Sequence, residues 1–264
     1  MHVVVCTKQT PDSAAAMKIE DGKAAWGDSP MVVNPWDEYA IEEAIRIKEN
    51  KGGKATAITL GPDRAREVLK TCIAIGCDEA VLVSDEAFDG SDARVTAVIL
   101  AAAIRKLGDV DLVIFGKQAI DGDTGLVPMA LARMLGWSPL SYVFEISELE
   151  PDQKQIRVAR LLEEGKQLCS APLPAVVSVV KDINEPRYPS FIGIRRAGKA
   201  EIPVWTAADL ELDASSIGAG ASAVSWSDIR GLPDRAGSVE IIEGDSPAEI
   251  ATTLADRLLA EKVI

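Results

Sequence analysis

Short apolar runs alternate with stretches of helical hydrophobic spacing through the first half of the chain. The apolar runs lie at about residues 3–6, 54–60, 80–83 and 111–115, and the helical stretches at about 36–50, 63–75, 93–107 and 125–136. Apolar runs this short are typical of strands buried on both faces, as in a parallel sheet. The repeated strand–helix order therefore predicts an α/β fold with a parallel sheet and right-handed crossovers.

The pattern changes after Trp137. Further strands are predicted at about 143–149, 155–162, 166–169 and 175–180, separated by turns at Asp152 and Glu164–Gly165. Strands this closely spaced predict an antiparallel extension that completes the sheet. Near the N-terminus, Asp21–Gly22 is a typical turn dipeptide and predicts a small hairpin within residues 15–27.

The C-terminal third is less regular. Residues 211–245 are rich in Ser, Ala, Gly and Asp, which predicts an extended arm. Residues 247–262 predict a terminal helix whose apolar stripe needs a surface to pack on, either a partner chain or the chain's own domain. We therefore divide the chain into an α/β domain at 1–180, a partner-recognition segment at 181–210, and an arm with the terminal helix at 211–264.

Composition and charge narrow the class of protein. Hydrophobic residues make up 47% of the 264 residues and aromatic residues only 5%, so aliphatic side chains must form the core. No apolar run approaches the roughly 18–20 residues that span a bilayer, and the first residues predict a strand rather than a signal peptide. We therefore expect a cytoplasmic protein without membrane insertion. The formal net charge of −13 argues against nucleic-acid binding.

Residues that many catalytic and metal sites require are missing or scattered. His2 is the only histidine, which excludes Ser–His and Cys–His nucleophilic systems and multi-histidine metal sites. The four cysteines contain no CxxC pair and are expected to be buried hydrophobes. Asp121 and Asp123 lack the third acidic neighbour that a magnesium site would need. We therefore predict neither catalytic residues nor a metal.

Ligands of an open parallel sheet bind beyond the carboxyl ends of its strands. The loops Thr7–Gln9, Gly61–Pro62, Gly90–Asp92 and 116–127 are expected to meet there. The last loop is the richest, because Gly116, Gly122 and Gly125 let a ligand approach the backbone. Asp123 and Thr124 are expected to cap the following helix, whose start offers N–H groups to a phosphate. Alternatively, Asp121 and Asp123 do no more than cap that helix and hold a turn.

Three other side chains near these loops have two interpretations each. Asn34 could only cap the helix that follows it, or its amide could also contact a ligand. Trp36 could belong to the core or line the mouth of a cofactor site. Lys8 could bind a phosphate or remain solvated. Neither GxGxxG nor GxxxxGK[ST] is present, which disfavours a nicotinamide dehydrogenase and a P-loop enzyme.

Residues 184–198 place an apolar tip, Phe191–Ile194, between Pro186, Pro189 and the pair Arg195–Arg196. Prolines remove backbone donors and disfavour a core strand or helix here. The segment predicts either an ordered surface loop that presents hydrophobic side chains to a partner or an ordinary buried turn.

Taken together, these residues resemble the β subunits of electron-transfer flavoproteins over nearly the whole chain. The resemblance rests on Val5–Gln9, the Asn34–Pro35–x–Asp–Glu run, Leu60–Pro62, the 116–123 loop and, most specifically, Asn184–Ile194. It implies a Rossmann-like, adenine-nucleotide-binding α/β fold in a heterodimer with an α subunit. FAD held mainly by that α subunit would carry the electrons. Flavin dehydrogenases of the acyl-CoA dehydrogenase type would supply them, and a quinone oxidoreductase or another acceptor would take them.

The resemblance also implies the site residues. AMP, or a second FAD in the electron-bifurcating and NADH-oxidising branch, would be bound by Cys6, Asn34, Pro35, Trp36, Asp37, Leu60, Gly116, Lys117, Gln118, Ala119, Ile120, Asp121, Gly122, Asp123, Thr124, Gly125, Leu126 and Val127. Partner binding would involve Arg187, Tyr188, Phe191, Ile192 and Ile194, with Phe191 as the apolar anchor that enters the dehydrogenase.

The 118–124 run is similar to the bifurcating form, whereas Gly125–Met129 departs from both forms, and Pro128 offers no N–H to a pyrophosphate. AMP is slightly favoured over a second FAD. A stand-alone adenine-nucleotide-binding regulator is the alternative from another class, and it would need neither the 184–198 segment nor the terminal helix.

Overall fold

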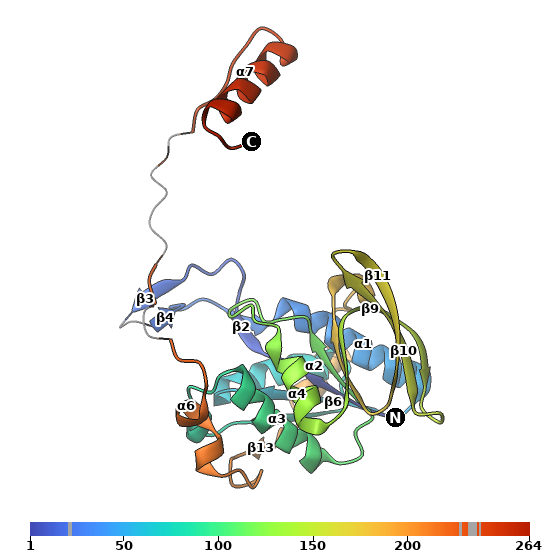
Figure 1. Cartoon of the computed structure of the whole chain (residues 1–264). Helices are drawn as coiled ribbons and strands as arrows, with labels where there is room; N and C mark the ends of the chain where they lie inside the picture. Colours follow the sequence, from blue (N-terminus) through green and yellow to red (C-terminus); the bar gives the residue numbers. More distant parts are fainter. Residues whose placement is uncertain (21–22, 227–228, 232–236, 238) are drawn as a thin grey trace. The chain divides into compact units, whose positions relative to one another are not determined.

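The computed structural model describes the chain except residues 21–22, 227–228, 232–236 and 238 (Figure 1). The chain divides into two compact units, Met1–Ile229 and Arg230–Ile264. The first unit contains a nine-stranded sheet in the order β11-β10-β9-β12-β8-β1-β6-β7-β13. Its strands are β1 (His2–Cys6), β6 (Lys54–Leu60), β7 (Glu79–Val83), β8 (Leu112–Gly116), β9 (Ser138–Glu150), β10 (Gln155–Leu162), β11 (Gly165–Pro172), β12 (Ala175–Val179) and β13 (Val204–Trp205).

The predicted parallel sheet is confirmed. β1 lies between β6 and β8 and pairs in parallel with both, so the strand order reverses at β1. β9, β10 and β11 form the expected antiparallel extension. The antiparallel prediction for the last strand is wrong, because β12 runs parallel to both β8 and β9. All five residues of β12 are buried, as expected of a central strand that is covered on both faces.

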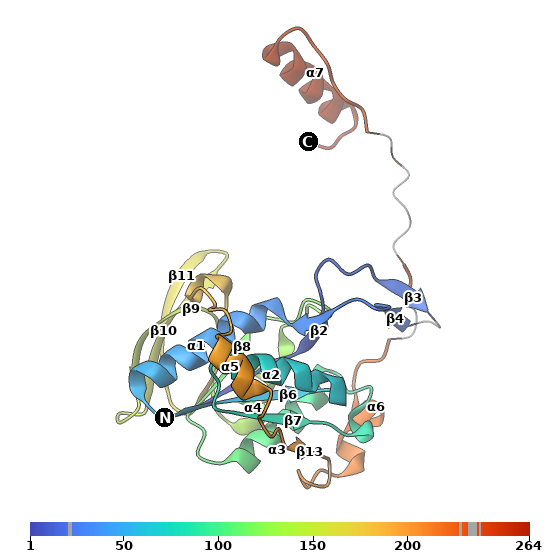
Figure 2. The ribbon, with the colours of Figure 1, turned by 180° about the vertical axis from the view of Figure 1, so that it is seen from behind.

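Helices cover both faces of the sheet. α1 (Pro35–Lys51) and α2 (Arg66–Ile75) contribute to one apolar core, and α3 (Ala93–Leu107) and α4 (Leu126–Leu135) to the other. Figure 1 views the α3–α4 face and Figure 2 the α1–α2 face. Two small antiparallel pairs, β2 (Gln9–Pro11) with β5 (Met31–Val33) and β3 (Lys18–Glu20) with β4 (Lys23–Ala25), follow β1. The latter pair is the predicted hairpin, although its turn at 21–22 lies outside the described residues.

The 184–198 segment contains a helix where the sequence predicts an ordered loop or a turn. A short η3 turn (Lys181–Ile183) precedes it, and Phe191–Ala197 forms a helix, α5, rather than a loop. The Ser190 hydroxyl accepts a hydrogen bond from the Gly193 N–H at 2.9 Å and so caps the helix. A Cβ at Gly193 would lie 2.0 Å from the Ala74 carbonyl oxygen, so only glycine lets α5 pack this closely on α2.

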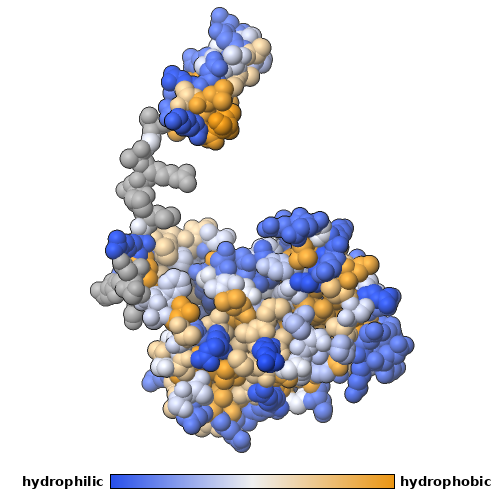
Figure 3. Space-filling view, in the orientation of Figure 1, coloured by the Kyte–Doolittle hydropathy of each residue, from blue (hydrophilic) through white to orange (hydrophobic). Residues whose placement is uncertain are grey.

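The predicted extended arm is also partly wrong. η4 (Ala214–Ser216) and α6 (Gly218–Ala221) belong to the first unit and lie against the loop that follows η2 (Glu86–Phe88). A short η1 turn (Asp63–Ala65) precedes α2. In the second unit, α7 (Pro247–Ala260) is the predicted terminal helix. Figure 3 shows hydrophobic surface gathered on one side of this unit, whose exposed apolar residues include Leu254, Leu259, Val263 and Ile264.

Candidate functional site

One buried carboxylate joins three elements at the carboxyl edge of the sheet. Asp37, in the first turn of α1, accepts hydrogen bonds from the Lys8 N–H at 2.8 Å and from the Gly116 N–H at 3.1 Å. The first N–H follows β1 and the second ends β8, the two strands beside the topological switch. Burial raises the pKa of Asp37 to about 7, although these hydrogen bonds act in the opposite direction.

Gly116 is pressed against α1. A Cβ at this position would lie 2.4 Å from the Trp36 carbonyl carbon and 2.5 Å from Asp37 Oδ1. The glycine is therefore required for the contact between β8 and the start of α1 rather than only for access of a ligand.

Asn34 attaches the 116–125 loop to α1. Its fully buried amide donates from Nδ2 to the Gln118 carbonyl at 2.9 Å and accepts at Oδ1 from the Ile120 N–H at 3.1 Å. Asn34 occupies the N-cap position of α1 without a side-chain capping bond. Of the two interpretations from sequence, the cap is therefore wrong, and the amide serves the loop.

The acidic residues of this loop do not cap α4. Lys8 Nζ lies 2.8 Å from the Asp121 carboxylate, and Gln118 donates to Asp123. Gly125 takes the N-cap position in a left-handed conformation, and no side chain caps the helix. The Thr124 hydroxyl lies at 3.5 Å from the Leu126 N–H, which is the limit of a hydrogen bond. The start of α4 thus keeps backbone donors and a positive dipole end for an anion.

Trp36 and Lys117 form an aromatic–cation cluster with a residue that the sequence did not single out. Lys117 Nζ lies 5.3 Å from the centre of the half-buried Trp36 ring and 5.5 Å from that of Tyr142. Tyr142 has a φ of 58°, at a place where the register between β9 and its neighbours shifts. No periodicity in the sequence marks such a bulge.

Three further predicted residues pack in or against the core beside the site. The buried Cys6 and the half-buried Leu60 both pack in the apolar cluster that α3 and α4 cover, and Val127 packs against the same cluster. Burial raises the pKa of the Cys6 thiol, so this group stays neutral. Leu126 is exposed, with 59% of its surface accessible. The exposed Leu126 and the half-buried Val127 offer an apolar surface at the anion-attracting start of α4.

Residues 217–224 of the chain cover the loop Gly90–Asp92, which was expected to meet the other loops at this edge. Asp92 caps α3 through the Val95 N–H at 2.8 Å, and its second oxygen accepts from the Ala223 N–H at 2.7 Å. A Cβ at Gly90 would lie 2.7 Å from Ala219 Cβ. Gly90–Asp92 is therefore an attachment point for residues 217–224. The loop at Gly61–Pro62 differs, because the η1 turn that follows it contacts the segment after β1: Gln9 donates to the Arg64 carbonyl at 3.1 Å.

The 184–198 segment presents an exposed apolar tip, and the alternative of a buried turn is wrong. Tyr188 and Phe191 are each 93% exposed, and Ile192 and Ile194 are also exposed. Arg187, in contrast, lies on α1 and forms ion pairs with Glu42 and Glu49.

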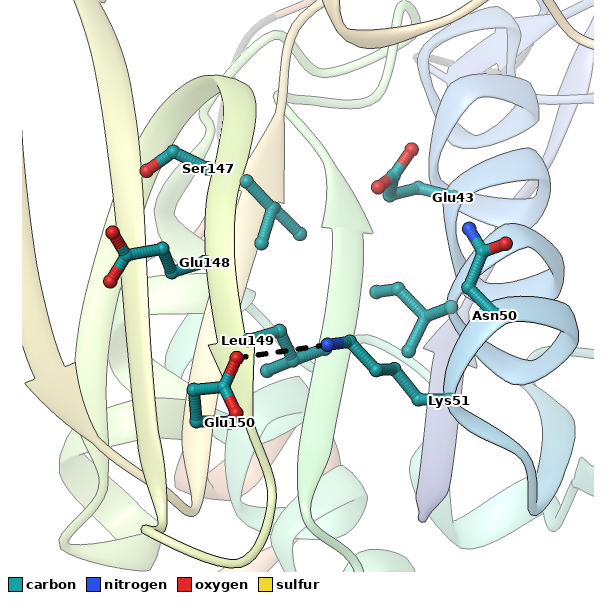
Figure 4. Close-up of a pocket in the computed structure, with 9 residues that line it drawn as sticks. Glu43, Asn50, Lys51, Ser147, Glu148, Leu149 and Glu150 are labelled. Atoms are coloured by element: carbon teal, nitrogen blue, oxygen red, sulfur yellow. Dashed lines mark ion pairs between the residues drawn. The ribbon is translucent and has the colours of Figure 1, made fainter.

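Two surface hollows among the described residues lie away from the predicted site. One of about 210 Å³ lies between the second half of α1 and β9 (Figure 4). Glu43, Asn50 and Lys51 rim it from α1, opposite Ser147, Glu148 and Glu150 of β9. A second, of about 530 Å³, is bordered by Glu79–Val81 of β7 and Lys199–Glu201. The predicted nucleotide residues line neither of these two hollows.

Comparison with known proteins identifies the family. The electron transfer flavoprotein domain matches residues 27–210. The chain belongs to the electron transfer flavoprotein family. It is 36% identical to the electron transfer flavoprotein subunit beta of Megasphaera elsdenii, with all of both chains covered. It is 37% identical to the caffeyl-CoA reductase-Etf complex subunit CarD of Acetobacterium woodii, again over both full lengths.

Protein FixA of Azotobacter vinelandii is 36% identical, over 99% of this chain and 95% of its own length. The relative in Megasphaera elsdenii is named as a β subunit, in agreement with the sequence resemblance, and the family is associated with flavin. Among the residues that the structure describes, no helix is long and apolar enough to cross a membrane, and no group of three or more His, Cys, Asp or Glu could hold a metal ion.

Proposed function

We propose that this chain is the β subunit of a heterodimer that carries electrons from flavin dehydrogenases, through FAD shared with an α subunit, to a quinone oxidoreductase or another acceptor. We further propose that it binds the adenylate part of AMP or of a second FAD at the 116–127 loop. Nucleotide binding is supported above all by the start of α4. This helix start lacks a side-chain cap, although the loop before it is fixed by hydrogen bonds to Asn34 and Asp37. Bound FAD would supply the redox chemistry.

The residues around α4 would fix the nucleotide without reacting with it. The backbone N–H groups of the first turn of α4 would donate to phosphate oxygens, and the helix dipole would favour their negative charge. Lys8 is half exposed and pairs with Asp121, so its ammonium lies close enough to the loop to help neutralise a phosphate. Asn34 and Asp37 would hold the loop in place before any ligand arrives.

The exposed tip at Tyr188–Ile194 supports the role in docking. Large apolar side chains that are almost fully exposed on a fixed backbone are typical of partner-binding surfaces. The full-length match to subunits of larger assemblies likewise favours a carrier over a stand-alone regulator.

A bifurcating carrier with a second FAD and NADH oxidation is the second candidate. The similarity of Gln118–Thr124 to the bifurcating form favours it. The relative in Acetobacterium woodii is named as part of a reductase complex, which is compatible with either carrier.

The Phe191→Ala variant of the purified heterodimer tests the docking role. We expect electron transfer from a flavin dehydrogenase to slow at least about tenfold at limiting carrier, because anchor residues supply much of an interface's free energy. The flavin content should not change. Leu168→Ala removes another exposed apolar side chain, 73% accessible and on β11, and serves as the control. Equal rates for Phe191→Ala and the wild type would contradict the docking role.

A further inference from the structure

Arg187 is held on α1 by two carboxylates. Its guanidinium donates to Glu42 at 2.8 and 3.0 Å and to Glu49 at 2.7 and 2.9 Å. Its backbone N–H donates to Glu42 as well, at 3.2 Å. Two paired contacts of this kind use the planar fork of an arginine side chain, and a lysine could not reproduce them.

One of the two carboxylates is buried and the other, Glu49, is half exposed, so the pair of Arg187 with Glu42 differs from an ordinary surface ion pair. The Glu42 side chain is only 5% exposed, and a buried carboxylate without a partner is costly. The hydrogen bond from Arg187 lowers the pKa of Glu49, and the two carboxylates raise the pKa of Arg187. We name the set Glu42, Arg187 and Glu49 the arginine clamp.

The recognition segment is fixed at both ends. At its start, Asn184 Nδ2 donates to the Tyr39 carbonyl of α1 at 3.0 Å. At its end, Arg196 donates to the carbonyls of Ile73 and Cys77, each at 2.7 Å, and so attaches α5 to α2. Between these points, Tyr188 and Phe191 contact mostly solvent. The arginine clamp is the attachment nearest to them on the α1 side.

We propose that Arg187 is a positioning residue, which holds the apolar tip in its docking conformation through the arginine clamp instead of contacting the dehydrogenase itself. This inference rests on the proposed docking role of the segment, and it gives Arg187 an indirect role in place of the direct partner binding that the resemblance implies. A segment that is ordered before binding avoids the conformational entropy cost of ordering in the complex. Loss of the clamp therefore lowers the fraction of chains that are competent to dock.

Two kinetic variants and a matched control test the proposal in the intact heterodimer. Arg187→Gln removes the clamp, and Glu49→Gln weakens it without leaving a buried charge unpaired. Arg195→Gln removes the same charge from the same segment, and Arg195 takes part in none of the ion pairs found among the described residues. If the competent fraction falls to about one tenth, the KM of a flavin dehydrogenase for the carrier rises about tenfold while kcat and flavin content stay unchanged.

Hydrogen exchange provides a readout that does not depend on docking. The amides of Gly193 and Ile194 should exchange faster in Arg187→Gln and Glu49→Gln, and not in Arg195→Gln. The double variant Glu42→Gln/Arg187→Gln should behave like Arg187→Gln, which separates loss of the clamp from the effect of a buried Glu42 left with only its 3.8 Å contact to Arg46. Unchanged exchange in the clamp variants, or an equal rise in KM for Arg187→Gln and Arg195→Gln, would overturn the proposal. Failure of Phe191→Ala to affect transfer would instead overturn the docking role itself.

Discussion

Asp37 shows how a single side chain organises the site. Its two oxygens accept N–H groups that follow β1 and end β8, so the loops after both strands are fixed relative to α1. The sequence identified Asp37 only through its family resemblance. The spacing of residues in the sequence does not predict the hydrogen-bond partners of Asp37, because Gly116 lies 79 residues away along the chain.

Asp37 should give the chain a specific pH dependence of stability. Burial raises its pKa from 3.8 to about 7, so the folded chain holds this proton more tightly than the unfolded chain. The resulting stabilisation is full below the ordinary pKa and is lost as the pH rises to about 7. Relative to Asp37→Asn, the wild type should therefore lose free energy of unfolding between about pH 5 and about pH 8. Denaturant titrations at both pH values measure this difference, and parallel curves for the two proteins would contradict it.

Gly116 and Gly122 form a matched pair for testing the close approach of the loop to α1. A Cβ at Gly116 would overlap Trp36 and Asp37, whereas a Cβ at Gly122 would meet no atom within 4 Å. We expect Gly116→Ala to lower the free energy of unfolding by about 1–3 kcal/mol and Gly122→Ala to change it little. Urea titration of both variants decides the point, and a stable Gly116→Ala would show that the backbone can shift without cost.

At the scale of elements, α1 is shared by the two proposed functional surfaces. Its first turn holds the 116–125 loop through Asn34 and Asp37, and its later turns hold the recognition segment through Glu42 and Glu49. The distance between the nucleotide loop and the docking tip is thus set by a single 17-residue helix.

Asp92 connects the start of α3 to residues 217–224, which lie far away in the sequence. Asp92 caps α3 and also accepts N–H groups from Ala223 and Val224. Asp92→Ala should lower the free energy of unfolding by about 1–2 kcal/mol and speed proteolysis near residue 222. Asp213→Ala removes the cap of η4 and is the control. Unchanged cleavage in Asp92→Ala would mean that other contacts hold the segment.

The regular elements were predictable from the sequence, and the short ones were not. β6 and β10 have their predicted bounds because apolar runs between turn residues determine them. α5 was missed because seven residues between Ser190 and Gly198 show no helical period, and its packing depends on the Gly193–Ala74 contact. The roles of Tyr142 and of the Arg187 ion pairs were also missed. Both depend on contacts between segments that lie far apart in the sequence.

At the scale of the whole molecule, the second unit provides a candidate surface for the α subunit. Leu254 and Leu259 of α7 are 46% and 58% exposed. We propose that they pack on the partner, so Leu254→Glu/Leu259→Glu should weaken the heterodimer by at least about tenfold, since burial of each leucine is worth about 1.5–3 kcal/mol. Thr253→Glu, on the same helix, is the control. Titration calorimetry with the α subunit measures the change, and equal affinity of all three proteins would contradict this use of α7.

Net charge also acts at this scale. With a formal charge of −13, the chain should associate with a partner of opposite charge faster at low salt, because exposed charges are screened beyond a Debye length of about 10 Å at 0.1 M salt.

We propose that this β subunit binds its own adenine nucleotide at the 116–127 loop, beside the FAD shared with the α subunit. The most direct test is the nucleotide content of the denatured, co-purified heterodimer, measured by absorbance and chromatography. We expect two adenine nucleotides per heterodimer: one FAD with one AMP for a simple carrier, or two FAD for a bifurcating one. A single FAD with no second nucleotide would contradict it.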